Sequence, residues 1–220
     1  MPKTLILISF FCLSIFAASA GEDEALEPIF NGKDLTGWKV PDPNPFWTVK
    51  DGVLVGEETD KKMKGHVLET AKEYGDVIVE LEVRWTKGAD SGVFLRKGQR
   101  WQCQIGDSVS LKKDMTCSLY LPKVAYKAAP AHDVDKMLKV DDWNKIRIDA
   151  RGPKYKIWLN GTLVNEYESN EFNEPGPIGL QIHGGLIMKV EFRNVMAKAL
   201  KAEVKPDVAP AVPAAPAPAK

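Results

Sequence analysis

Hydrophobic and polar residues alternate along most of the chain between residues 29 and 200, as in β-strands that bury one face and expose the other. The clearest run is residues 77–85, where Glu80, Glu82 and Arg84 line one face and mostly aliphatic residues line the other. Asp-Gly and Asn-Gly dipeptides between such runs mark hairpin turns, and helical periodicity is nearly absent. The pattern predicts an all-β fold, specifically an antiparallel β-sandwich of the jelly-roll type with one concave face. Strands and hairpins are expected at residues 46–56, 66–70, 77–85, 90–96, 101–107, 117–121, 143–150, 155–159, 162–167, 178–185 and 188–195.

The stretch from Asp90 to Tyr120 predicts an unusual sheet face. In its middle strand Gln102 and Gln104 share one face, opposite a face of tryptophan, cysteine and isoleucine. The same alternation places Arg96 and Tyr120 on polar faces of the flanking strands. A solvated sheet face normally carries lysine, glutamate and threonine, so this residue set suits a polar, neutral ligand such as a sugar.

Composition limits the classes of function. The chain has 220 residues, with 30 basic and 30 acidic side chains and therefore no net charge. It contains no block of Lys and Arg interleaved with aromatic residues, which argues against nucleic-acid binding. Its length fits one globular domain with a real core, and nothing in it indicates an oligomeric state.

The N-terminus predicts export. Lys3 precedes an apolar run, and Ala18-Ser19-Ala20 is a small-residue cleavage site, so a secretory signal is expected to be cut after Ala20. The apolar run is too short for a comfortable membrane anchor, so no membrane insertion is expected after cleavage. Export places the mature chain in the periplasm or outside the cell. The expected organisation is a signal peptide at 1–20, a flexible N-terminus at 21–28, a β-sandwich at 29–200 and a Pro/Ala-rich disordered tail at 201–220.

Two cysteines remain in the mature chain, Cys103 and Cys117. Both are predicted on apolar strand faces, so they form either a disulfide in an oxidising compartment or two buried free thiols. Neither has a second Cys or His at a spacing typical of zinc ligands.

Nine short motifs follow one another along the predicted sandwich. They are, in order, IFNGKDLTGW, WTVKDGVLVG, YGD, LEVRW, SGVFLR, QIGD, WLNG, GPIGLQIHG and FRNV. With these motifs in this order, the chain resembles the 3-keto-disaccharide hydrolase domain family over about residues 29–200. The resemblance implies a concanavalin A-like jelly roll, secretion in bacteria and action on sugars oxidised at carbon 3. One position departs from the pattern, because the family often has a glutamate where this chain has Gln102.

A 3-keto sugar changes what the site needs. An ordinary glycosidase uses two carboxylates, and this sequence has no clear pair near His183. A ketone at carbon 3 acidifies the hydrogen on carbon 2, so one base can expel the aglycone by elimination, after which water adds. Such a site needs a base and a group that stabilises the enolate.

The candidate catalytic residues are His183 or Glu82 as the base, Arg96 as the electrophile and Asp107 at a strand end. Each has a structural alternative: a sheet histidine, an ion pair between Glu82 and Arg96, or a turn-capping aspartate. A divalent cation held by Glu82, Asp107 and His183 remains open. The candidate sugar-binding residues are Gln102, Gln104, Tyr120 and Gln181. The alternative function is a non-catalytic carbohydrate-binding module, which the glutamine-rich face and Gln102 also suit.

Overall fold

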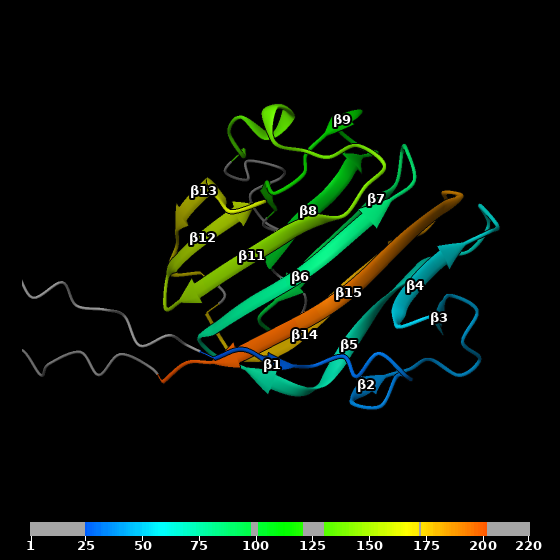
Figure 1. The fold of residues 1–220 in the computed structure, drawn as a ribbon, viewed down its shortest axis with the longest axis horizontal. Helices are drawn as coiled ribbons and strands as arrows, with labels where there is room; N and C mark the ends of the chain where they lie inside the picture. The colour runs from blue at the N-terminus through cyan, green and yellow to red at the C-terminus, as the bar shows by residue number, and fades with distance from the viewer. Residues whose placement is uncertain (1–24, 98–100, 121–129, 172, 202–220) are drawn as a thin grey trace, which may run out of the picture.

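The computed structural model describes residues 25–97, 101–120, 130–171 and 173–201, which form two antiparallel β-sheets packed face to face (Figure 1). The predicted signal peptide lies outside the described residues, as does the predicted tail apart from Lys201. Glu27–Pro28, which the sequence placed in the flexible N-terminus, forms β1 and pairs with β15.

One sheet has eight strands in the order β13-β12-β11-β6-β15-β4-β3, with β1 paired to β15. Hairpins make its two ends, and the C-terminal strand β15 inserts between β6 and β4. Its strands are β1 (Glu27–Pro28), β3 (Trp47–Lys50), β4 (Val53–Glu58), β6 (Val77–Trp85), β11 (Asn144–Arg151), β12 (Lys154–Leu159), β13 (Thr162–Glu168) and β15 (Met188–Ala199).

The other sheet has seven strands in the order β10-β8-β7-β14-β5-β2, with β9 paired to β8. The hairpin β7–β8 lies beside β14, so segments far apart in sequence become neighbours. Its strands are β2 (Trp38–Lys39), β5 (Gly65–Tyr74), β7 (Asp90–Leu95), β8 (Trp101–Ser108), β9 (Lys113–Asp114), β10 (Leu119–Tyr120) and β14 (Gly176–His183).

The core lies between the two sheets and is built from the apolar half of each alternating strand. Trp47, Trp101 and Phe192 are among its largest fully buried side chains. The Trp101 ring stacks on Tyr155 with the ring centroids 3.6 Å apart, which joins the two sheets. The predicted antiparallel jelly-roll sandwich is confirmed. The described residues contain one short 3₁₀ helix, Val134–Lys136, and no helix in them is long and apolar enough to cross a membrane.

Cys103 and Cys117 are free thiols in this core, and both are buried. A hydrogen bond to Cys103 and burial together raise the pKa of the Cys117 thiol well above its usual value. The thiol therefore stays protonated and unreactive while the protein is folded.

Alkylation of freshly purified, unreduced protein tests this arrangement. The folded protein should take up little reagent, whereas denaturation without reductant should expose two reactive thiols, counted by mass spectrometry. Reduced and denatured protein is the positive control. No uptake after denaturation alone, with two thiols appearing after reduction, would show a disulfide instead.

Candidate functional site

Three glutamines and a histidine gather on the outer face of the seven-stranded sheet. Gln102 and Gln104 come from β8, and Gln181 and His183 come from β14. Alternation explains this, because Trp101 and Leu180 belong to the buried core and their neighbours in sequence point the other way. The structure thus brings four of the predicted site residues onto one face.

A glycine makes contact across the intervening strand possible. Gly92 of β7 lies opposite Gln104 in the β7–β8 register. A Cβ at Gly92 would lie 2.6 Å from Nε2 of Gln102, closer than real side chains approach. The missing side chain therefore lets Gln102 lie across β7 and reach Gln181 on β14.

The glutamines form a continuous hydrogen-bonded chain. Nε2 of Gln102 donates to Oε1 of Gln104 at 2.8 Å and to Oε1 of Gln181 at 2.9 Å. Nε2 of Gln104 donates to Oδ1 of Asp90 at 2.8 Å and to the main-chain oxygen of Asp107 at 3.0 Å. Gln104 is 2% exposed, so it is an inner member of the chain, whereas Gln102 and Gln181 are only partly buried.

Asp90 ends this chain, and the sequence analysis did not single it out. Its side chain is buried, and Oδ2 accepts a hydrogen bond from the Val109 amide at 2.9 Å. A signal was present, because Asp90, Gly92 and Phe94 share the strand face opposite Val93. A buried carboxylate at one end gives the row of amides a fixed direction.

His183 lies at the edge of an open hollow of about 550 Å³ on the same face. Its Nδ1 lies 2.7 Å from the main-chain oxygen of Gly184. A carbonyl only accepts, so Nδ1 carries the proton of the neutral ring and Nε2 carries a lone pair. Gly65 lies directly opposite His183 in the β5–β14 register and has no side chain to fill the hollow. Gln181 and Lys64 also line it.

Tyr120 lies beside the glutamines. It faces Gln102 directly in the β8–β10 register, so the two residues occupy adjacent positions of the sheet. Tyr120 is partly buried and packs against the edge of the core. Its hydroxyl oxygen is buried, so the predicted contact with a sugar hydroxyl stays a prediction.

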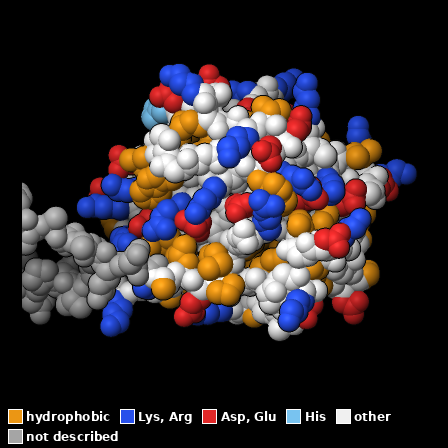
Figure 2. All heavy atoms as spheres, viewed as in Figure 1, with side chains coloured by type: hydrophobic (Ala, Val, Ile, Leu, Met, Phe, Trp, Pro, Cys, Tyr) orange, Lys and Arg blue, Asp and Glu red, His pale blue; other side chains and the backbone are white. Residues whose placement is uncertain are grey.

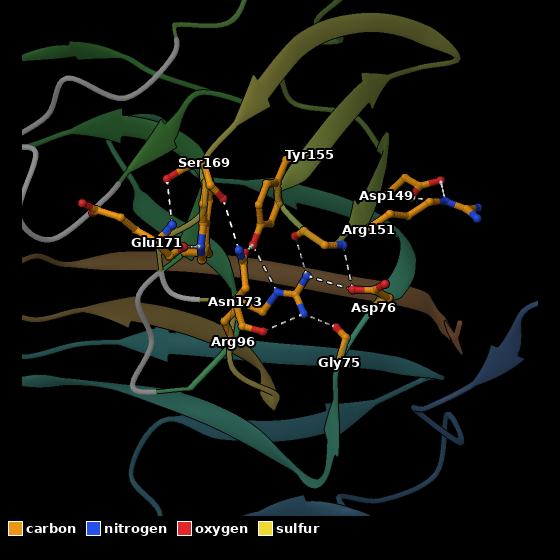
Figure 3. Close-up of polar contacts among 11 residues, drawn as sticks. Gly75, Asp76, Arg96, Asp149, Arg151, Tyr155, Ser169, Glu171 and Asn173 are labelled. Atoms are coloured by element: carbon orange, nitrogen blue, oxygen red, sulfur yellow. Dashed lines mark hydrogen bonds and ion pairs between the residues drawn. The ribbon is translucent and has the colours of Figure 1, made fainter. Parts of the chain in front are cut away.

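Arg96 does not lie on this face, which corrects its predicted place on a polar strand face. The residue has a φ of 70°, so it leaves the strand geometry and the alternation that places Phe94 outward no longer applies. Its side chain instead lies buried at one end of the sandwich (Figure 3). Its ionic partner is Asp76, at 3.4 Å, and not Glu82.

The Arg96 guanidinium joins three turns. Nη1 donates to the main-chain oxygen of Gly75 at 2.6 Å, and Nη2 donates to that of Gly152 at 3.2 Å. Nε donates to the Tyr155 hydroxyl at 3.1 Å, and Nη1 also reaches the Asn173 oxygen at 3.4 Å (Figure 3). With its donors occupied by the protein, Arg96 is a structural residue.

Glu82 belongs to the other sheet. It lies on β6 of the eight-stranded sheet. Figure 2, viewed from the side of that sheet, shows basic and acidic side chains interspersed on the surface. The Glu82 carboxylate accepts from Arg193 Nε and Asn194 Nδ2, both at 2.8 Å. Burial acts to raise its pKa, but these hydrogen bonds and the Arg193 charge lower the pKa below its usual value. A carboxylate held in this way is a weak base, and it does not share a face with His183.

The main-chain oxygen of Asp107 accepts a hydrogen bond from Gln104, but its side chain points away from the glutamines. The side chain lines a separate cleft of about 410 Å³ together with Asp114 and Trp85. Burial, followed by the charges of Asp114 and Asp90, raises the pKa of the Asp107 carboxyl. Within the described residues, no group of three or more His, Cys, Asp or Glu is placed to hold a metal ion. The predicted cation site of Glu82, Asp107 and His183 is therefore not assembled.

Comparisons with solved structures find the same sandwich fold in several other proteins. A protein named as a candidate glycosyl hydrolase from Parabacteroides distasonis ATCC 8503 is 24% identical, with a TM-score of 0.61 over 80% of this chain and 100% of that one. The carbohydrate binding module CBM66 from Bacillus subtilis is 16% identical, with a TM-score of 0.54 over 75% and 97%. The β-glucanase from Bacillus licheniformis is 16% identical, with a TM-score of 0.54 over 80% and 98%. Identities this low show a shared fold.

The family is shown by sequence. No curated protein matches the chain. The model of the 3-keto-alpha-glucoside-1,2-lyase-like domain matches residues 25–198, nearly all of the sandwich. The motifs predicted this family, and the chain therefore belongs to the 3-keto-alpha-glucoside-1,2-lyase-like domains.

Proposed function

We propose that this protein is a secreted enzyme that cleaves 3-keto-glycosides on the outer face of the seven-stranded sheet, with His183 as the base. One observation carries the proposal: an imidazole whose free nitrogen is Nε2 lies beside a row of amides at an open hollow. The amides suit sugar hydroxyls and the hollow is large enough for a sugar ring. Membership of the family supports the substrate class.

In the proposed reaction, Nε2 of His183 takes the hydrogen on carbon 2, which the ketone at carbon 3 makes acidic. The electron pair left on carbon 2 moves to the ketone oxygen as an enolate. It then returns to form the C1–C2 double bond while the C1–oxygen bond to the aglycone breaks. The aglycone oxygen leaves with a proton from the imidazolium or from water. Water adding to carbon 1, with a proton to carbon 2, completes the hydrolysis.

The alternative is a carbohydrate-binding module without catalysis. It is favoured by the amide-lined face, on which the buried carboxylate of Asp90 is already occupied by Gln104 and Val109. Similarity in fold to CBM66 supports the same alternative. The two functions share a site and differ only in whether His183 takes a proton.

The test is incubation of the purified mature protein with a 3-keto-glucoside and, separately, with the parent glucoside, with and without a chelator. We expect release of the aglycone from the 3-keto compound only. In deuterium oxide, elimination followed by addition leaves deuterium on carbon 2 of the product, whereas direct displacement does not. The 3-keto product kept in the same buffer without enzyme corrects for spontaneous exchange.

Binding of the 3-keto-glucoside without release, under every metal condition, would assign the protein to the binding-module class. Release from the parent glucoside at the same rate would contradict the requirement for the ketone. If the protein neither binds nor cleaves the 3-keto-glucoside, the proposal that this face acts on carbohydrates is wrong.

A further inference from the structure

The hydrogen-bonded chain on the polar face has a direction that chemistry alone determines. Both acceptors facing Nε2 of Gln104, the Asp90 carboxylate and the Asp107 main-chain oxygen, can only accept. The amide group of Gln104 must therefore turn its nitrogen toward them and its Oε1 toward Gln102. Nε2 of Gln102 donates to that Oε1 and also to Oε1 of Gln181.

This direction decides what Gln181 presents to a ligand. Its Oε1 is occupied by Gln102, and within the described residues no acceptor takes the hydrogens of its Nε2. Gln181 lines the hollow together with His183, two residues further along the same strand face. Two positions along a strand span about 6.6 Å, so both side chains reach one sugar ring.

We propose, on the basis of the function proposed above, that Gln181 is the electrophile that holds the carbon-3 ketone oxygen while His183 removes the hydrogen on carbon 2. Asp90 is the positioning residue that fixes the Gln181 amide through Gln104 and Gln102. Gln181 thus takes the place that the sequence analysis gave to Arg96. A donor aimed at the ketone stabilises the enolate as its charge develops.

The inference makes a specific claim about selectivity. A ketone oxygen only accepts, whereas a hydroxyl group donates and accepts. An Nε2 donor at Gln181 can therefore bind either oxygen, whereas an exposed Oε1 would accept only from the hydroxyl of the parent sugar and would repel the ketone. Losing the hydrogen bond and leaving two acceptors face to face should change the ratio of the two affinities by about 10- to 100-fold.

Asp90→Asn tests the chain with an almost isosteric change. The Val109 amide needs an acceptor, so the new Nδ2 faces Gln104 and opposes its amide nitrogen. Gln104 then faces one donor, the new Nδ2, and one acceptor, the main-chain oxygen of Asp107, so its amide is no longer held in one direction. In the reversed arrangement Gln181 presents Oε1. We expect the ratio of dissociation constants for the 3-keto-glucoside and the parent glucoside to shift in favour of the parent glucoside. The measurement uses the His183→Ala background, so that no turnover disturbs the equilibrium.

Gln181→Glu tests the electrophile directly and does not depend on Asp90. Gln181 is only partly buried, so the variant is expected to fold, and it presents acceptors alone. Asp149→Asn, on β11 of the other sheet, is the matched control and should leave the ratio unchanged. Melting by circular dichroism verifies folding of each variant, and Gln181→Glu decides the matter if Asp90→Asn does not fold.

The outcomes separate this inference from the function it rests on. A shift of the affinity ratio toward the parent glucoside in Gln181→Glu and in folded Asp90→Asn supports the inference. Wild-type cleavage with an unchanged ratio in Gln181→Glu overturns the electrophile and leaves the proposed function standing. A changed ratio in Gln181→Glu with an unchanged ratio in folded Asp90→Asn overturns the positioning role. Absence of wild-type cleavage and of binding overturns the proposed function itself.

Discussion

Replacing His183 by alanine is expected to lower kcat for a 3-keto-glucoside by about 10²- to 10⁴-fold, the usual scale for loss of a general base. The KM should change little, because the amides that we propose for sugar binding, Gln102 and Gln181, stay joined to each other and in place. The main-chain oxygen of Gly184 holds the proton at Nδ1, so only Nε2 of His183 can act as the base. Steady-state kinetics on purified wild type and variant measure both constants.

Two controls show whether a base or a fold has been lost. His132→Ala removes an exposed histidine of a loop and should leave kcat unchanged. Free imidazole should restore part of the turnover of His183→Ala, because the hollow beside it is open. Full turnover in His183→Ala together with inactivity in Glu82→Gln would move the base to the other sheet. If neither change matters, the polar face is not the active site.

The fold could be predicted because strand alternation reports burial locally. The predicted strand at 77–85 coincides with β6, and the two Asp-Gly and Asn-Gly hairpins lie where their dipeptides are. Alternation fails where the backbone leaves the strand region. Cys117 has a φ of 61°, so β10 begins only at Leu119, two residues after the predicted start.

The site was predictable in part, for the same reason. Alternation correctly placed Gln102, Gln104, Gln181 and His183 on polar faces. The apolar residues of both strands face the core, so these polar side chains share the outer face of one sheet. It could not assign Glu82 to a sheet, because that depends on pairing of β6 with β11 and β15, far away in sequence. Asp90 was missed although alternation places it on the polar face, because an aspartate beside a turn is usually a turn residue.

Arg96 gives the second large effect, and it is on stability. Arg96→Met keeps most of the side-chain length but removes every donor, so the carboxylate of Asp76 loses its charged partner and the oxygens of Gly75 and Gly152 lose theirs. Removing one member of a buried, hydrogen-bonded ion pair costs about 3–5 kcal/mol of unfolding free energy. For a domain of this size that lowers Tm by roughly 10 °C. Differential scanning calorimetry of the mature protein measures it.

Arg147→Met is the matched control, because that arginine lies on the outer face of the eight-stranded sheet with its side chain 34% exposed. A surface ion pair is worth at most about 1 kcal/mol, so the Tm of Arg147→Met should hardly move.

The Tm of Arg96→Lys should fall between those of wild type and Arg96→Met, because lysine keeps the charge and loses the planar fork that reaches three turns. The decisive comparison is kinetic, well below the melting temperature. If Arg96 is structural, folded Arg96→Lys cleaves the 3-keto-glucoside at the wild-type kcat. An unchanged Tm with a large fall in kcat would return Arg96 to the active site, against the geometry of Figure 3.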